Sequence, residues 1–283
     1  QDELKSNLIS YDFAFSQFTK HEIQLVEEAI KQGYRKIISV GGDGTLHHVV
    51  NGIMLQTYVN SSDIKLGVIP LGTGNDWIKT YNIPNTIRGS IDIIVNGTDF
   101  YQDIGCIELE NNNIEYFNNL AGIGYDGYII HKLKKLKRFG SIAYILSGLY
   151  GLFFYRKTFY EIEINNTKIS SKCLMILIGL CQYSGGGMQM TKEPLSNDGL
   201  FDVTVVKNFS FLDLIVNLPK LYNGTIVNHK KVENLKTSQI KIIELNTKES
   251  FVEADGELIG KNQLKVTIIK KSIRFIIPKS AIN

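Results

Sequence analysis

Hydrophobic and polar residues follow two different periods along this chain. In the first part, apolar runs at residues 36–40 and 66–69 each end in a glycine-rich segment, and helix-like spacing follows. After the first run, the apolar positions on one helix face are Leu46, Val49, Val50, Ile53 and Met54. The pattern predicts two strand–loop–helix junctions in tandem, which are typical of an α/β domain.

Two more elements are predicted before the first junction. Residues 11–15 alternate in the manner of a strand, and a helix is expected from Thr19 to Gly33. The apolar face of that helix comprises Ile23, Val26, Ala29 and Ile30.

From residue 98 onward the pattern changes to short alternating strands with polar turns. The predicted strands are 100–105, 114–120, 159–164, 173–181, 200–207, 239–245, 251–255 and 263–270. We therefore expect an α/β domain at 1–97, a mostly antiparallel β domain with few helices at 98–271, and a final strand in the tail 272–283.

Composition narrows the class of protein. At 283 residues and 43% hydrophobic, the chain can bury a substantial core, and a formal charge of +3 does not indicate nucleic-acid binding. Cys106, Cys173 and Cys181 lack metal-site spacing, which favours core thiols of a cytoplasmic protein. The longest apolar stretch, 142–155, is too short to span a bilayer.

The two glycine-rich loops are candidate phosphate sites. Their candidate ligand-binding residues are Gly41, Gly42, Asp43, Gly44 and Thr45 in the first loop, and Gly72, Thr73, Gly74, Asn75 and Asp76 in the second. A helix that begins at such a loop, capped by Asp43 or Thr45, presents unpaired N–H groups to an anion. A glycine turn that serves only tight packing is the alternative, and neither loop fits a P-loop or a dinucleotide fingerprint.

These motifs resemble the diacylglycerol kinase catalytic domain family. The segments that carry the resemblance are Gly-Gly-Asp-Gly-Thr-Leu at 41–46, Val-Val-Asn-Gly at 49–52 and Pro-Leu-Gly-Thr-Gly-Asn-Asp at 70–76. The resemblance implies an α/β domain like those of NAD kinases and phosphofructokinases, a β-sandwich domain, and ATP with Mg²⁺ as cofactors. It also implies that the tail returns to the first domain. The family's early strand and Asn-Pro-x-Ser-Gly-x-Gly turn have no counterpart in this sequence.

Three further segments match the family. By resemblance, Asp255 is the general base and Glu257 supports it, and a strand ending in Asp-Gly-Glu would place both carboxylates on one strand face. The turn at 194–200 implies a structural Mg²⁺ on Asp198 and the carbonyls of Leu195 and Leu200. In the stretch 119–127, Asp126 is a candidate contact to the substrate, with an Asx turn or helix cap as its alternative. Without the resemblance, the first two segments would be plain hairpin turns.

Other residues have more ordinary interpretations. Trp77 is predicted to anchor the core, and His47 and His48 to lie on a solvated helix face rather than to share a metal. The basic run 131–138, followed by apolar residues 139–155, favours contact with anionic lipid over a merely solvated surface.

The sequence thus predicts an ATP-dependent lipid kinase that phosphorylates a lipid hydroxyl, with diacylglycerol as the expected acceptor and phosphatidic acid as the product. Its partner would be a lipid at the membrane surface, with no nucleic acid and with a homodimer possible. The alternatives are a soluble NAD kinase, which shares the first loop, and a nucleotide-regulated lipid-binding module without activity.

Overall fold

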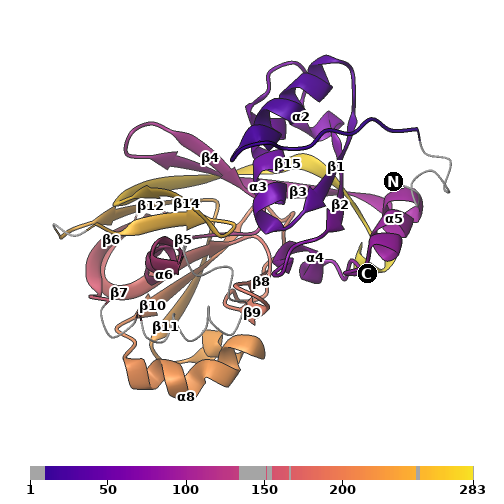
Figure 1. Ribbon diagram of the computed structural model, residues 1–283. Helices are drawn as coiled ribbons and strands as arrows, with labels where there is room; N and C mark the ends of the chain where they lie inside the picture. The colour runs from indigo at the N-terminus through magenta and orange to yellow at the C-terminus, as the bar shows by residue number, and fades with distance from the viewer. Residues whose placement is uncertain (1–9, 134–150, 152–154, 166, 247–248, 283) are drawn as a thin grey trace. The chain divides into compact units, whose positions relative to one another are not determined.

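The computed structural model describes residues 10–133, 151, 155–165, 167–246 and 249–282 (Figure 1). The chain divides into two compact units, residues 1–102 with 271–283 and residues 103–270. Two strands, β3 (Thr98–Leu109) and β15 (Gln263–Ile277), begin in one unit and end in the other.

The first unit is an α/β domain with a parallel sheet. Residues of β1 face residues of β2 from Lys36 opposite Lys65 to Gly41 opposite Pro70, and the end of β15 pairs in parallel with β2. The elements of this unit, apart from the strands it shares, are α2 (His21–Lys31), β1 (Lys36–Gly41), α3 (Asp43–Leu55), η1 (Ser61–Asp63), β2 (Lys65–Pro70), α4 (Asp76–Thr80), α5 (Ile87–Asn96) and η4 (Lys279–Ile282). The predicted α/β class is confirmed.

Close packing joins the helices of the first unit to each other and to the sheet. A Cβ at Gly52 of α3 would lie 2.8 Å from the Cβ of Val26 on α2, so these helices approach at van der Waals distance. Helix α5 packs Ile91 and Ile94 against Ile69 of β2. These contacts fix the two glycine loops at the carboxyl ends of β1 and β2.

Trp77 is a core residue, as predicted. It is 1% exposed, and its ring lies 4.5 Å from that of Phe275 and 4.8 Å from that of Tyr81, measured between centroids. Its indole N–H donates to the side-chain oxygen of Gln102 at 3.0 Å. This hydrogen bond gives the indole N–H, the polar group of the tryptophan side chain, a partner inside the core.

The predicted strand at 11–15 is wrong. These residues have no regular structure, and Phe13 and Phe15 are 63% and 75% exposed. Alternation predicts a strand only where a partner strand can complete the backbone hydrogen bonds, and no pairing within the described structure includes this segment.

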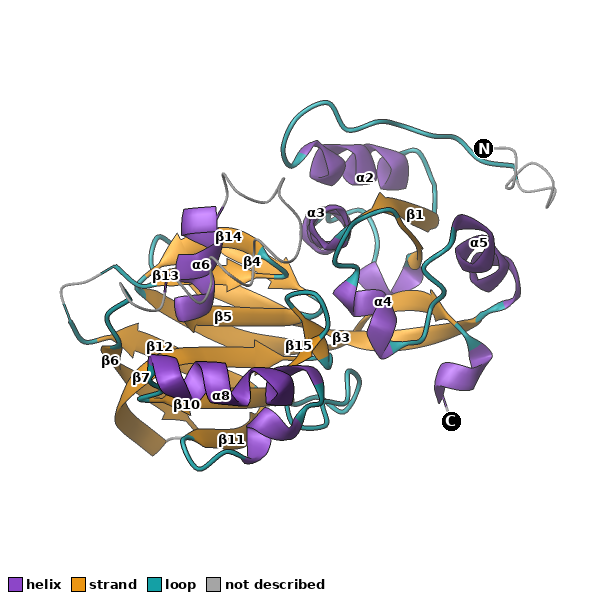
Figure 2. Ribbon diagram, turned by 60° about the horizontal axis from the view of Figure 1, so that its bottom comes forward, coloured by secondary structure: helices purple, strands orange, loops and turns teal. Residues whose placement is uncertain are grey.

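The second unit is mostly antiparallel β structure (Figure 2). Its further strands are β4 (Ile114–Phe117), β5 (Leu120–Gly124), β6 (Thr158–Ile164), β7 (Thr167–Gly179), β8 (Tyr183–Ser184), β9 (Met188–Gln189), β10 (Phe201–Lys207), β11 (Val232–Thr237), β12 (Gln239–Glu244), β13 (Phe251–Ala254) and β14 (Glu257–Lys261). Strand β7 pairs with β6 along its first half and with both β5 and β10 along its second. The predicted antiparallel β domain is confirmed.

The helices whose bounds the structure describes in the second unit are α6 (Tyr125–Leu133), α8 (Phe211–Tyr222) and η3 (Thr225–Asn228). Helix α8 begins with a capping box, in which Ser210 and Asp213 each accept a hydrogen bond from the other's backbone N–H. Helix α8 and strands β11 and β14 were not predicted from the sequence. The Ser-x-x-Asp signal before an apolar run could have located α8.

No helix in the described part of the chain combines the length and hydropathy needed to cross a membrane. Of the basic and apolar region at 131–155, residues 134–150 and 152–154 lie outside the described residues, so the lipid contact expected there stays a prediction.

Candidate active site

The two glycine-rich loops lie against each other at the carboxyl ends of β1 and β2. Gly41 and Pro70 are partners in the parallel ladder, and the N–H of Leu71 donates to the carbonyl of Gly41 at 2.8 Å. In open α/β sheets, this edge is where ligands bind.

Backbone meets backbone between the loops. A Cβ at Gly72 would lie 2.5 Å from the Cα of Gly42, and one at Gly42 would lie 3.1 Å from the Cα of Gly72. A Cβ at Gly41 would lie 2.4 Å from the hydroxyl oxygen of Thr45. Tight packing therefore accounts for these three glycines, and it brings the main chains of both loops to one place.

The side chain of Asp43 joins the two loops. Its carboxylate accepts hydrogen bonds from the N–H of Asp76 at 2.9 Å and, more weakly, from that of Trp77 at 3.4 Å. These are the first N–H groups of α4, so Asp43 supplies the acceptor that an N-cap would give. The expected capping of α3 by Asp43 or Thr45 is wrong, because the N-cap is Gly42 and makes no side-chain bond.

The second loop is closed by Asn75. This residue has a φ of 47°, its side-chain oxygen accepts from the N–H of Gly72 at 3.1 Å, and its amide donates to the carbonyl of Gly72 at 2.8 Å. Next to it, the buried carboxylate of Asp76 lies 2.6 Å from the ammonium of Lys79. Thr73 is exposed, and a Cβ at Gly74 would lie 3.0 Å from the carboxylate of Asp43.

The first turn of α3 is the better candidate for an anion. Helix geometry points the N–H groups of Gly44 and Thr45 outward at its N-terminus, where the helix dipole favours negative charge. The corresponding groups of α4 already bind Asp43. The ten predicted loop residues thus lie in two adjacent loops, and Asp43 of the first loop occupies the N-terminal N–H groups of the helix that follows the second.

The predicted solvated position of His47 and His48 is wrong. His47 is 0% and His48 7% exposed, and the rings lie 5.6 Å apart between centroids. The Nδ1 atom of His48 lies 3.2 Å from the carboxylate of Glu22 on α2. The polar type of these residues gave no sign of this burial, because it depends on packing in the folded unit, in which α2 lies against His48.

In the second unit, Asp255 lies at the tip of the β13–β14 hairpin. Asp255 and Gly256 have φ values of 50° and 82°, and Ala254 pairs with Glu257 across the turn. Both central residues therefore have the left-handed conformation of a type I′ turn, for which Asp-Gly is a favoured pair. The hairpin turn considered at the sequence level is present.

This turn also holds a buried carboxylate. Asp255 is 9% exposed, and its carboxylate accepts from the N–H groups of Asn118 at 3.2 Å, Asn119 at 3.0 Å and Leu120 at 3.1 Å. Three amide donors fix the direction of the carboxylate. A plain surface turn would not need them.

The expected common strand face for Asp255 and Glu257 is wrong. The turn separates the two residues, so Glu257 lies at the start of β14 and faces Ala254 of β13. The prediction assumed a continuous strand, in which residues two apart share a face. The two-residue turn reverses the chain between Asp255 and Glu257, so that relation does not apply to them.

A second carboxyl pair lies beside this hairpin and was missed. Glu253, on β13, is 2% exposed and accepts from the N–H of Gly256 at 2.9 Å. Burial, and then the neighbouring charge of Asp126, raise the pKa of Glu253 well above its ordinary value. Burial also raises the pKa of Asp126, whose side chain forms a hydrogen bond with that of Glu253.

Two ionised carboxylates repel each other in a buried site, so the raised pKa values favour the protonated forms of this pair. Asp126 is thus placed in the first turn of α6 with Glu253 as its neighbour. The missed signal was a glutamate inside the strand Phe251–Ala254, which is otherwise apolar.

The turn at 194–200 is held by Asp103. Its carboxylate accepts from the N–H of Gly199 at 2.7 Å, and its own N–H donates to the carbonyl of Ser196 at 2.7 Å. Asp198 accepts from the N–H of Leu200, and the ammonium of Lys236 lies 3.8 Å from its other oxygen.

The oxygen donors of Asp198, Leu195 and Leu200 fit a hard cation such as Mg²⁺ in kind, although the nearby ammonium reduces the local negative charge. Among the described residues, no three His, Cys, Asp or Glu side chains cluster as a metal site.

Comparison with known proteins shows which protein family this fold and these motifs match. The family model described as the diacylglycerol kinase catalytic domain matches residues 1–107, and the YegS C-terminal NAD kinase beta sandwich-like domain matches residues 119–277. The chain is 31% identical over 259 residues to a diacylglycerol kinase of Staphylococcus haemolyticus, covering 91% of this chain and 75% of that protein. It is 30% identical to a diacylglycerol kinase of Staphylococcus aureus, covering 91% and 79%.

Solved structures share the fold. A structure described as a diacylglycerol kinase from Bacillus anthracis superposes with a TM-score of 0.68 at 18% identity, covering 94% of this chain and 84% of that one. The protein is thus a two-unit phosphotransferase of the lipid kinase class, with an alcohol as acceptor. The chain belongs to the diacylglycerol kinase family.

Proposed function

We propose that this protein transfers the γ-phosphate of ATP to the hydroxyl of diacylglycerol and produces phosphatidic acid. The observation that carries the proposal is the double loop, in which Gly42 and Gly72 meet backbone to backbone and Asp43 ties the second loop to the first. This edge of a parallel sheet is a ligand site in α/β proteins, and it presents the N-terminus of α3 to a phosphate.

ATP and Mg²⁺ would bind to different groups of the two loops. The N–H groups at the start of α3 suit phosphate oxygens, whereas the carboxylates of Asp43 and Asp76 repel phosphate and suit a cation. Mg²⁺, when bound, neutralises charge on the phosphates during transfer. A structural Mg²⁺ on Asp198 with the carbonyls of Leu195 and Leu200 remains part of the proposal.

Asp255 is proposed as the general base for the lipid hydroxyl. Its carboxylate is held by three backbone N–H groups, so its direction is fixed before the substrate arrives. Glu257 follows in the same hairpin and is proposed to support the charge of the site. Asp126 is proposed to contact the lipid headgroup, with Glu253 as its buried partner.

The lipid acceptor is inferred from the relatives that are named diacylglycerol kinase. A lipid acceptor implies work at a membrane surface, and we propose a cytoplasmic protein that associates peripherally with the bilayer. A homodimer is compatible with this proposal.

The test compares Asp255→Asn with the wild type in transfer of labelled phosphate from ATP to diacylglycerol in mixed micelles. Asparagine also suits the left-handed turn conformation, so the hairpin should form while the carboxylate is lost. We expect kcat to fall by roughly 10²- to 10⁴-fold, the usual contribution of a general base.

Asp92→Asn, an exposed change on α5, is the matched control and should keep the wild-type rate. Circular dichroism of both variants checks the fold. Full activity of Asp255→Asn would remove Asp255 from the reaction, and transfer to NAD instead of lipid would refute the proposed acceptor.

A further inference from the structure

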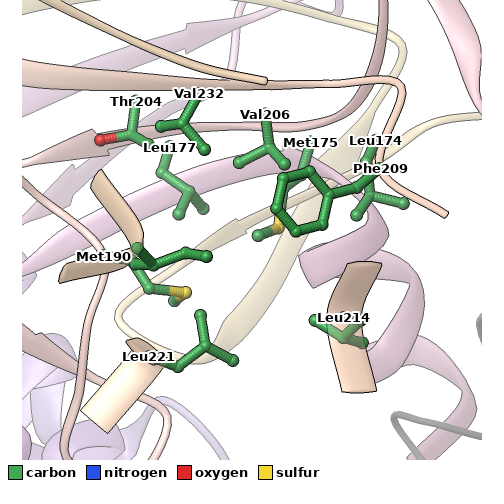
Figure 3. Close-up of a pocket in the computed structure, with 11 residues that line it drawn as sticks. Leu174, Met175, Leu177, Met190, Thr204, Val206, Phe209, Leu214, Leu221 and Val232 are labelled. Atoms are coloured by element: carbon green, nitrogen blue, oxygen red, sulfur yellow. The ribbon is translucent and has the colours of Figure 1, made fainter. Parts of the chain in front are cut away.

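Helix α8 carries apolar residues on two opposite faces. The inner face comprises Phe211, Leu214, Leu218 and Leu221, which pack against the core of the second unit. Figure 3 shows Leu214 and Leu221 turned toward Met175 and Phe209, around a small pocket with an apolar lining. This face alone is enough to dock the helix on the sheet.

The outer face is apolar as well. Leu212, Ile215 and Val216 are 70%, 43% and 72% exposed, and Pro219 is exposed beside them. These four residues, which we call the outer stripe, recur at i, i+3, i+4 and i+7 and so share one side of the helix. The exposed side of a surface helix is normally polar, and a contiguous exposed apolar patch marks an interaction surface.

Basic residues lie on helix α8 and beside it. Lys220 lies within α8, Lys230 and Lys231 follow η3, and Lys157 and Lys172 lie on the chain near Asn208, just before the helix. Their proximity has an electrostatic effect, because burial and then the charges of Lys172 and Lys231 lower the pKa of Lys157. The acidic residue of the helix, Asp213, already pairs with Lys231.

Charge decides between the two main partners for this surface. A two-fold contact between copies would bring the same lysines of both chains face to face, which like charges disfavour. Four side chains also fall short of the roughly 800 Å² per partner that a stable protein interface buries. An anionic bilayer accepts apolar side chains between its headgroups and attracts these lysines.

We propose that the outer stripe of α8 and its lysines dock this protein on an anionic lipid bilayer. Leu212, Ile215 and Val216 enter the headgroup region, and Lys220 and Lys230 contact lipid phosphates. The inference builds on the proposed function only in that a lipid acceptor also resides in a bilayer.

The test measures co-sedimentation of the full chain with vesicles of phosphatidylcholine alone and of phosphatidylcholine with phosphatidylglycerol. Wild-type protein should bind the anionic vesicles more tightly, with an affinity that falls as salt rises. The double variant Leu212→Gln with Val216→Gln should bind anionic vesicles about tenfold or more weakly. The reason is that burial of one apolar side chain of this size changes affinity by about that factor. Both positions are exposed, so the fold should persist.

Ile114→Gln is the matched control, because Ile114 is an exposed apolar residue on β4, which pairs with β3 and not with the strands beneath α8. It should bind anionic vesicles as the wild type does. For the charges, Lys220→Gln with Lys230→Gln should weaken binding by about fivefold per lysine, and Lys265→Gln on β15 should not.

Unchanged binding by the Leu212/Val216 variant, or an equal loss in Ile114→Gln, would overturn the proposal. Light scattering tests whether a second copy of the chain binds the outer stripe instead. If the wild type is a dimer and the Leu212/Val216 variant is a monomer that still binds vesicles, the stripe is a dimer interface and the proposal is wrong. Kinase activity on a short-chain diacylglycerol in detergent separates the two proposals. If the wild type shows no such activity, the proposed function is refuted. The vesicle measurements would still show whether α8 binds an anionic bilayer.

Discussion

At the scale of single residues, two carboxyl groups in the interior of the second unit have raised pKa values. Glu253 and Asp126 are neighbouring carboxyl groups, and burial raises the pKa of each. The charge of Asp126 raises the pKa of Glu253 further, whereas the hydrogen bond with Glu253 acts to lower that of Asp126. In the unfolded chain both groups ionise at their ordinary pKa values. The folded protein therefore binds more protons than the unfolded chain above those values, and this pair makes the protein less stable as the pH rises toward the folded pKa.

Glu253→Gln should remove this loss. Glutamine is neutral at every pH, can accept from the N–H of Gly256, and can donate to Asp126. At low pH the variant and the wild type should be equally stable. Above the ordinary glutamate pKa, the variant should gain about 1.4 kcal/mol in relative unfolding free energy per pH unit, until the folded pKa is reached. Urea unfolding at a series of pH values measures the difference.

Glu249→Gln, whose side chain is 62% exposed in the wild type, serves as the control and should show no such trend. Parallel pH profiles for the wild type and Glu253→Gln would mean that Glu253 ionises normally in the folded protein.

At the scale of elements, α4 depends on a side chain from the other loop. The helix has five residues, it follows Asn75 in the left-handed conformation, and it has no cap of its own. A helix this short is not stable alone. The carboxylate of Asp43 provides what it lacks, and α4 in turn holds Trp77 in the core.

Asp43→Ala should therefore destabilise the first unit by about 1 kcal/mol, the typical contribution of an N-cap acceptor. Asp43→Asn retains one acceptor oxygen and should recover part of the loss. Trp77 is the single tryptophan of the chain, so its fluorescence during urea unfolding follows this unit directly. Equal midpoints for the wild type and Asp43→Ala would show that α4 does not need the carboxylate.

At the scale of the whole molecule, two strands belong to both units. Strands β3 and β15 cross the division of the chain, so each contributes residues to both units, and the first unit is completed by the segment that returns at residues 271–283. A nucleotide bound on the loops of the first unit should stabilise that unit, because it binds the folded chain and not the unfolded one.

With Mg²⁺ present, ATP at about 100 times its Kd should raise the unfolding free energy reported by Trp77 by about 2.7 kcal/mol. Gly42→Val should lose most of this shift, since its side chain would occupy the space beside the Cα of Gly72. The shift is measured for each protein against its own ATP-free sample, which separates binding from any loss of stability. A full shift in Gly42→Val would contradict the phosphate-loop assignment.

The sequence by itself determined what depends on near neighbours. Period-two and period-3.6 patterns located most strands and helices, and glycine spacing located both loops and the family, because these signals extend over a few residues. The absence of a partner strand for residues 11–15 was invisible to the same reasoning.

Only the tertiary structure decided which distant groups meet. Asp43 binds N–H groups 33 and 34 positions along the chain, and Asp255 binds N–H groups 135 to 137 positions away. The burial of His47 depends on packing in the folded unit, and so do the raised pKa values of Glu253 and Asp126. Such contacts depend on how separate elements pack. Local sequence patterns extend over a few residues, so they cannot predict a contact between residues that far apart in the chain.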